Sequence, residues 1–198
     1  MSFLIIGGFL GSGKTSLLLE LTSYMRRELG IEKTVILENE IGQVGIDDTT
    51  LSGSGYSVTG MFAGCVCCTL AGELALTVQA IERDMAPEWF IMEATGMAFP
   101  QNVKENLHDV LEIDPRICCL VDAKRWMRLL RPMEHLLPFQ LKEADTVLIN
   151  KTDLVSEEEL AAVHESVQSF CGPQAKIYHV CLAEGIDKEI LSDILGTK

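Results

Sequence analysis

Short apolar runs recur along the chain and predict a β-sheet buried on both faces. Each run is rich in Val, Ile, Leu or Phe, which is typical of strands in a parallel sheet covered on both sides. We therefore predict strands over residues 3–8, 33–39, 88–94, 116–122, 145–151 and 175–180.

Helical patterns lie between these runs, and the clearest span residues 14–29, 70–85 and 156–170. The last begins with Ser156 and has Glu159 three residues on, the spacing of a capping box. Alternating strands and helices predict an α/β fold, a doubly wound, mainly parallel sheet with helices on both faces. Ligands of such folds bind beyond the carboxyl ends of the strands.

A phosphate-binding loop follows the first predicted strand. The run GFLGSGKT, residues 8–15, matches G-x-x-x-x-G-K-[ST] between a strand and a helix, which is the context that the motif requires. Its backbone N–H groups should face phosphate oxygens, Lys14 should reach the β- and γ-phosphates as a catalytic residue, and the Thr15 hydroxyl should bind Mg²⁺. The predicted nucleotide-binding residues here are Gly8, Gly11, Ser12, Gly13, Lys14, Thr15 and Ser16.

A second motif favours guanine as the base. Asn150, Lys151 and Asp153 follow the predicted strand at 145–151 in the pattern N-K-x-D. A carboxylate at Asp153 can accept hydrogen bonds from guanine N1–H and N2–H₂ together, whereas adenine offers no such donor pair. Asn150 can tie this loop to the phosphate loop. The last contact to the base should come from residues at Cys181 and Leu182, after the final strand.

Composition limits the partners and the compartment. The chain has 198 residues and a net charge of −13. Nucleic-acid binding needs basic stripes, so the charge argues against it. No run approaches the roughly 20 apolar residues of a membrane span, and the first strand has no basic leader, so we expect a cytoplasmic protein with no membrane partner.

Three of the seven cysteines, Cys65, Cys67 and Cys68, crowd into one short loop. Clustered thiols in an intracellular chain favour a soft or borderline transition metal. A redox loop and small buried side chains remain as alternatives. Cys118 and Cys119 lie inside a predicted strand, so they should pack in the core. The histidines are scattered, and none has metal-like spacing to another: His108, His135, His164 and His179.

The order of the motifs resembles that of the CobW-type branch of the metal-handling GTPases, related to UreG and HypB. These motifs are the phosphate loop, residues 38–42, the loop at 64–68, residues 93–96 and residues 150–153. The resemblance runs from about residue 3 to 183. It implies a P-loop NTPase fold of the SIMIBI-like kind. It also implies that residues 1–198 form one GTPase domain, without the C-terminal domain common in CobW-type proteins.

The resemblance also implies roles for acidic residues. Residues 38–42 become the first switch segment, in which Glu40 is a catalytic residue and an Mg²⁺ ligand, and Glu38 is an oxygen ligand for a transferable metal. Glu93 becomes the catalytic, Walker-B-type acid, which holds Mg²⁺ through water. Gln43 stands where the family commonly has an acid, and no Arg follows the cysteines closely.

Together these features predict a slow GTPase that binds GTP or GDP with Mg²⁺. It would carry Zn²⁺, or else Co²⁺ or Ni²⁺, on Cys65, Cys67 and Cys68 and deliver it to a client metalloprotein, either alone or as a homodimer. Slow hydrolysis is expected because no strong base or arginine finger stands out. The alternative is a nucleotide switch that gates or reactivates a cofactor-bearing partner, such as a corrinoid protein, with the cysteines as a metal or redox sensor.

Overall fold

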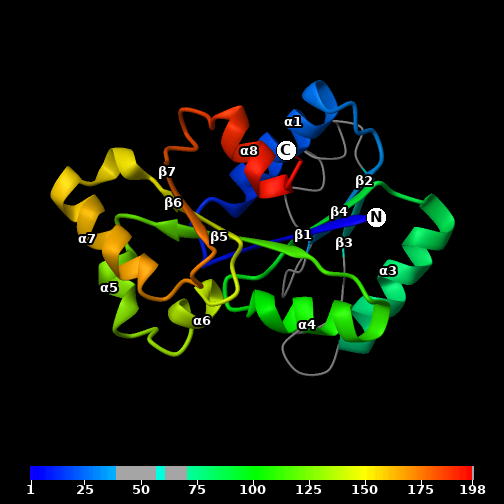
Figure 1. Cartoon of the computed structure of the whole chain (residues 1–198), viewed down its shortest axis with the longest axis horizontal. Helices are drawn as coiled ribbons and strands as arrows, with labels where there is room; N and C mark the ends of the chain where they lie inside the picture. The colour runs from blue at the N-terminus through cyan, green and yellow to red at the C-terminus, as the bar shows by residue number, and fades with distance from the viewer. Residues whose placement is uncertain (39–56, 61–70, 198) are drawn as a thin grey trace.

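The chain folds around one parallel sheet, shown in Figure 1. The computed structural model describes residues 1–38, 57–60 and 71–197. Within these residues, seven strands hydrogen-bond in the order β3-β2-β4-β1-β5-β6-β7, and all neighbouring strands run parallel. The strands are β1 Ser2–Gly8, β2 Thr34–Glu38, β3 Ser57–Gly60, β4 Trp89–Glu93, β5 Arg116–Asp122, β6 Thr146–Asn150 and β7 Lys176–Val180.

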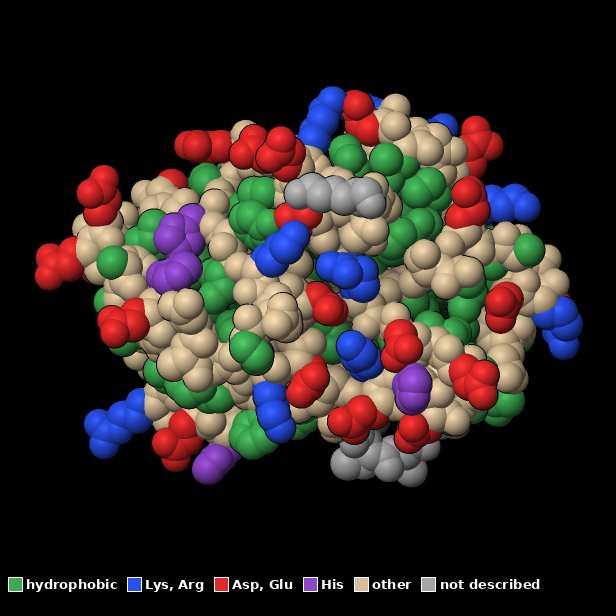
Figure 2. Space-filling model, viewed as in Figure 1, with side chains coloured by type: hydrophobic (Ala, Val, Ile, Leu, Met, Phe, Trp, Pro, Cys, Tyr) green, Lys and Arg blue, Asp and Glu red, His purple; other side chains and the backbone are tan. Residues whose placement is uncertain are grey.

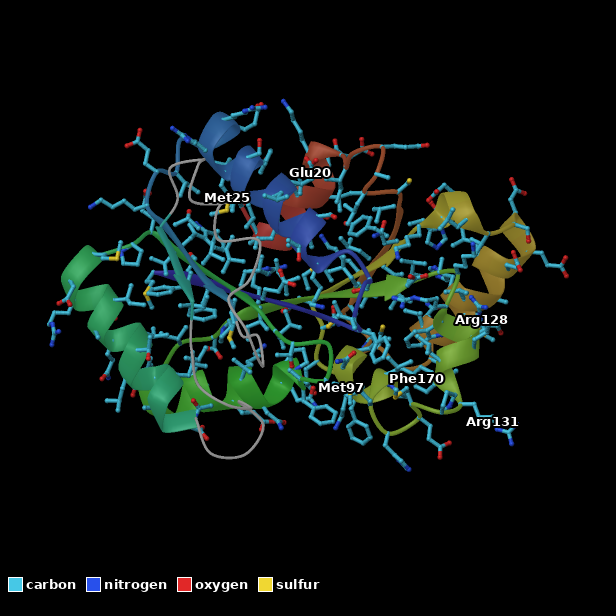
Figure 3. The ribbon with its side chains drawn as sticks, turned by 180° about the vertical axis from the view of Figure 1, so that it is seen from behind. Glu20, Met25, Met97, Arg128, Arg131 and Phe170 are labelled. Carbon is cyan, nitrogen blue, oxygen red and sulfur yellow. The ribbon has the colours of Figure 1, made fainter. Side chains whose placement is uncertain are left out.

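Helices cover both faces of the sheet because alternate strand residues point to opposite sides and both sets are apolar. Leu4 and Ile91 pack in one core with α1 (Lys14–Glu28) and α8 (Lys188–Leu195), and Ile5 and Phe90 pack in the other. Figure 3 shows Met25 on the first side and Phe170 on the second. The helices on the second side are α3 Ala71–Met85, α4 Pro100–Leu111, α5 Trp126–Leu130, α6 Leu137–Leu141 and α7 Glu157–Gln168.

The six strands and three helices predicted from the sequence are all present, within one or two residues of the predicted ends. The Ser156–Glu159 capping box also forms, with hydrogen bonds of 2.8 and 3.2 Å. The pattern gave no sign of β3, because SVTG is short and half polar. Helices α4, α5, α6 and α8 were not predicted either. Two of them, α5 and α6, are only five residues long, too short to show a helical period.

The parallel strands deliver polar residues to one edge of the sheet. Glu93 ends β4, Asp122 ends β5 and Asn150 ends β6, while β1 runs directly into the phosphate loop. Because these four strands are neighbours, their carboxyl ends form one continuous rim. No helix of residues 1–38, 57–60 and 71–197 is long and apolar enough to cross a membrane.

Candidate functional site

The phosphate loop connects β1 to α1 through a tight bend that requires glycine. Gly8 and Gly13 have φ of 129° and 112°, in the left-handed region that side chains disfavour. A Cβ on Gly8 would lie 2.4 Å from the Leu120 carbonyl oxygen, and one on Gly13 would lie 2.4 Å from Asn150 Nδ2. The loop therefore packs too closely against β5 and β6 for any larger residue at these positions.

A cavity of about 840 Å³ opens beside this loop at the carboxyl edge of the sheet. Lys14, which is 7% exposed, and Thr15 line it after β1, and Asp153 lines it after β6, on the other side of β5, so they lie toward opposite ends. The volume lies within the range of small-molecule and cofactor pockets. The complete lining is Leu10, Gly11, Gly13, Lys14, Thr15, Ser16, Glu93, Ala94, Thr95, Gly96, Met97, Asn150, Lys151, Asp153, Leu154, Cys181, Leu182 and Ala183.

Asn150 joins three segments of the chain at the floor of this cavity. Its Nδ2 donates to the Ser12 carbonyl oxygen at 2.8 Å, and its Oδ1 accepts from the Leu182 N–H at 3.0 Å. The side chain is 4% exposed, so neither bond is easily replaced by water. The link between the N-K-x-D run and the phosphate loop, predicted from the sequence, is thus present, and the Leu182 N–H is already engaged.

Asp122, at the end of β5, forms ion pairs with two basic side chains beside the phosphate loop. Lys151 Nζ and Arg125 Nε each lie 2.8 Å from its Oδ2. Lys151 Nζ also donates to the Gly11 carbonyl oxygen at 2.7 Å. Burial alone raises the pKa of the Asp122 carboxyl, but the hydrogen bonds and charges of Lys151 and Arg125 outweigh it and hold the pKa below its ordinary value. The ionised carboxylate therefore fixes the Lys151 stem along the loop.

At the far end of the cavity, Asp153 lies on a single 3-10 turn, Thr152–Leu154, that follows β6. Its Oδ1 accepts a hydrogen bond from the Cys181 thiol at 3.1 Å. This bond, followed by burial, raises the pKa of Cys181, so the sulfur stays protonated and acts as a donor. Asp153 therefore presents a carboxylate acceptor toward the cavity, as guanine recognition requires.

Thr15 and Glu93 supply hard oxygen donors at the phosphate end. The Thr15 hydroxyl donates to Glu93 Oε1 and Oε2, at 3.2 Å each. Mg²⁺ prefers hydroxyl, carboxylate and water oxygens and usually keeps several waters. The chemistry of a hydroxyl and a carboxylate this close together therefore fits such an ion.

The segment after β4 is held against the phosphate loop from a distant helix. Gln140 of α6 donates from Nε2 to the carbonyl oxygens of Gly96 and Ala98, at 3.1 and 2.8 Å. A Cβ on Gly96 would lie 2.7 Å from the Leu10 backbone nitrogen, so only glycine permits this approach. The two loops that flank the phosphate end of the cavity are therefore in direct contact.

The family model described as "CobW/HypB/UreG, nucleotide-binding domain" matches residues 2–178 of the chain. The chain belongs to the CobW/HypB/UreG family. The resemblance inferred from the motif order is confirmed. The match extends from the first strand almost to the end of β7, so it includes the phosphate loop and Asp153 but stops before the lining residues at 181–183.

Relatives of this CobW-type chain include two bacterial proteins named as zinc chaperones. Zinc chaperone CobW of Sinorhizobium sp is 28% identical over 83% of this chain and 54% of its own length. Zinc chaperone YeiR of Escherichia coli (strain K12) is 30% identical over 88% of this chain and 53% of its own length. The chain thus spans about half the length of the curated relatives it matches.

Among solved structures, the hydrogenase maturation factor HypB of Archaeoglobus fulgidus matches with a TM-score of 0.66 and 18% identity, over 100% of this chain and 90% of that one. The signal recognition particle receptor FtsY of Elizabethkingia anophelis matches with a TM-score of 0.62 and 13% identity, over 98% and 65%. Both likenesses show the fold, which confirms the predicted α/β P-loop architecture.

Most of the residues predicted to bind nucleotide line one cavity in the described part of this CobW-type chain. Gly11, Gly13, Lys14, Thr15, Ser16, Asn150, Lys151, Asp153, Cys181 and Leu182 line it, together with Glu93. Gly8 and Ser12 belong to the same loop but are absent from its lining, and Ser12 is fully buried. Glu40, Gln43, Cys65, Cys67 and Cys68 lie outside the described residues, as does the side chain of Glu38. Cys118 and Cys119 are fully buried in β5, as predicted.

Some residues that hold the loops around the cavity were not predicted from the sequence. Asp122 had a usable signal, because it ends a buried strand as Glu93 and Asn150 do. Gln140 had none, since its contacts lie more than 40 residues away along the chain. The scattered spacing of the histidines gave no sign that two of them meet, but the fold places ring nitrogens of His164 and His179 2.9 Å apart.

Proposed function

We propose that the chain binds GTP and hydrolyses it slowly, as a nucleotide-dependent transition-metal chaperone. One observation carries the nucleotide assignment. A single cavity has the phosphate loop and Thr15 at one end and Asp153 at the other. A nucleotide lying along this cavity would meet backbone N–H groups and Lys14 at its phosphates and a carboxylate at its base.

The base end supports guanine over adenine. Asp153 offers an acceptor, and Cys181, which donates to it here, can be displaced by the stronger N–H donors of guanine. The Leu182 N–H is engaged by Asn150, so the remaining backbone donor for the guanine carbonyl is that of Ala183, which has no partner within the described residues and lines the cavity. The loop at 181–183 therefore leaves one main-chain donor in place.

The predicted catalytic groups are Lys14 and Glu93, with Glu40 from the segment after β2. Phosphoryl transfer depends mainly on positioning and charge neutralisation, which the loop, Lys14 and a bound Mg²⁺ supply. Arg125 is close to the phosphate loop, but its guanidinium is bound to Asp122 and to the Leu10 carbonyl oxygen. It is thus held in a structural role, in keeping with a slow rate.

Strand register supports a metal site beside the phosphates. Gly60 of β3 is paired with Glu38 of β2, and Glu38 is paired with Glu93 of β4, so the three lie in one row at the carboxyl edge. Neighbouring strands are about 4.8 Å apart, which places Gly60 about 10 Å from Glu93. Cys65 follows Gly60 by five residues, a span of up to roughly 17 Å when extended.

The cysteines are therefore within reach of the Mg²⁺ and γ-phosphate position, and so is the segment that follows Glu38. We propose that Cys65, Cys67 and Cys68, with Glu38 as a further oxygen ligand, hold Zn²⁺, or else Co²⁺ or Ni²⁺. Relatives are named zinc chaperones and, in Dictyostelium discoideum, a zinc-regulated GTPase metalloprotein activator. By analogy, the cargo would pass to a client metalloprotein when the nucleotide changes state.

The test is a Zn²⁺ titration of the reduced protein, alone and with Mg²⁺ plus GDP or a non-hydrolysable GTP analogue. We expect one tightly bound ion whose affinity shifts about tenfold between nucleotide states, or about 1.4 kcal/mol of coupling. A Cys65/Cys67/Cys68→Ala variant should lose this ion, whereas Cys171→Ala, which removes a thiol from another part of the chain, should keep it. Zn²⁺ binding that ignores both the cysteines and the nucleotide would contradict the metal assignment.

A further inference from the structure

Two histidines that do not line the nucleotide cavity meet on the surface beside α7. His164 lies on α7 and His179 on β7, and His164 Nδ1 is 2.9 Å from His179 Nε2. The ring centroids are 5.0 Å apart and the rings are nearly perpendicular, at 82°. Figure 2 shows two histidine side chains in contact on this face, open to solvent.

We propose that His164 and His179 form a second, labile site for a divalent transition metal of the nickel or copper type. Neutral imidazole nitrogen is the commonest protein ligand for such ions. The site is independent of the cysteine loop and of the function proposed above, because it uses neither the cysteines nor the nucleotide residues.

The nitrogen–nitrogen distance can be compared with the separations that two ligands of one ion require. With metal–nitrogen bonds of about 2.05 Å, two nitrogens at a 90° angle lie about 2.9 Å apart, and at a tetrahedral angle about 3.3 Å apart. The observed 2.9 Å is the length of the hydrogen bond between the two rings, and it is also close to the separation that a 90° angle at octahedral or tetragonal ions such as Ni²⁺ and Cu²⁺ requires. His179 is exposed and His164 half-buried, so rotation about χ2 can turn both lone pairs toward one ion.

The remaining ligands must come from outside the described chain. Within residues 1–38, 57–60 and 71–197, no group of three or more His, Cys, Asp or Glu side chains could hold a metal. The histidine pair therefore offers two ligands, and water completes the coordination shell. Such a site binds weakly and exchanges quickly, which suits an ion in transit rather than a structural ion.

The experiment titrates the untagged, reduced protein with Ni²⁺ by calorimetry at about pH 7.5, where most imidazoles are neutral. It is run in the Cys65/Cys67/Cys68→Ala background, so that the outcome does not depend on the cysteine loop. One Ni²⁺ should bind, and His164→Ala or His179→Ala should each weaken it at least about tenfold, or about 1.4 kcal/mol. His135→Ala is the matched control, since His135 is 94% exposed and has no histidine neighbour among the described residues.

A second pair of variants, His164→Gln and His179→Gln, retains polar side chains at both positions but removes the strong metal ligand. They should lose Ni²⁺ binding as the alanine variants do, while their thermal unfolding stays close to that of the parent. Ni²⁺ binding that survives in the Gln variants, or that falls equally in His135→Ala, would overturn the proposal. Tighter binding of Zn²⁺ than of Ni²⁺ would overturn the assignment of the ion.

Discussion

Replacing Asn150 by Ala should loosen the nucleotide cavity at its floor. The substitution removes two hydrogen bonds and leaves the Ser12 carbonyl oxygen and the Leu182 N–H without a partner in a site that is 4% exposed. An unsatisfied buried group costs about 1–3 kcal/mol, and partial entry of water lowers the sum. We therefore expect the free energy of unfolding to fall by about 2–4 kcal/mol.

In a domain of this size, that loss corresponds to a decrease in melting temperature of about 5–15 °C. The measurements are thermal and urea unfolding, each with and without GDP, because GDP affinity should also fall by about tenfold or more. Asn150→Asp keeps an acceptor for the Leu182 N–H but places a carboxylate against the Ser12 carbonyl oxygen, so it should be at least as unstable. Asn102→Ala, on the exposed side of α4, is the control.

Melting of Asn150→Ala within about 1 °C of the parent, or an equal loss of stability in Asn102→Ala, would refute this role of Asn150. Destabilisation of Asn150→Ala with an unchanged affinity for GDP would refute it as well. In that case the contact between Ser12 and Asn150 would hold the fold together without shaping the site.

Three further substitutions test other parts of the site. Asp153→Asn should weaken GTP binding by about a hundredfold and favour xanthosine triphosphate, measured by competition with a fluorescent nucleotide; unchanged GTP affinity would rule out the guanine assignment. Asp122→Asn should lower the free energy of unfolding by about 1–3 kcal/mol near neutral pH, because Lys151 and Arg125 both lose their ion pair with this carboxylate. Since the folded-state pKa of Asp122 is lowered, its contribution to stability is present above the ordinary carboxyl pKa and is lost as pH falls. In urea unfolding, the difference in unfolding free energy between the parent and Asp122→Asn should therefore shrink below about pH 5. A difference that stays constant with pH would contradict this. Gly96→Ala should weaken GDP binding, because its Cβ would lie 2.7 Å from the Leu10 backbone nitrogen and displace the phosphate loop. Parental GDP affinity in calorimetry would contradict this expectation.

Local sequence predicted the features that contiguous residues determine. The phosphate loop is one such feature, because its glycines, Lys14 and Thr15 are adjacent and lie between a strand and a helix. The buried strands were also predictable, since an apolar run in a doubly wound sheet has few other conformations available. The burial of Cys118 and Cys119 could be predicted from the same apolar pattern.

Features that depend on packing between distant segments could not be predicted. Gln140 reaches the loop after β4 only because α6 packs beneath it, and nothing near Gln140 in the sequence shows that contact. The pairing of His164 with His179 likewise depends on how α7 lies against the last strand. In both cases the two residues are close in space but distant along the chain, so neither periodicity nor motif spacing predicts their contact.

The contact between Asn150 and Ser12, 138 residues apart along the chain, also has a consequence for the order of events during synthesis. The phosphate loop leaves the ribosome early, but the base end of its cavity needs β6 and the residues at 181–183. An unfinished chain therefore lacks the base-end contacts of the cavity, however well its first strand and helix have formed. Nucleotide at a hundred times its dissociation constant would add about 2.7 kcal/mol to the stability of the completed fold alone, so GTP would act as a ligand that selects finished chains.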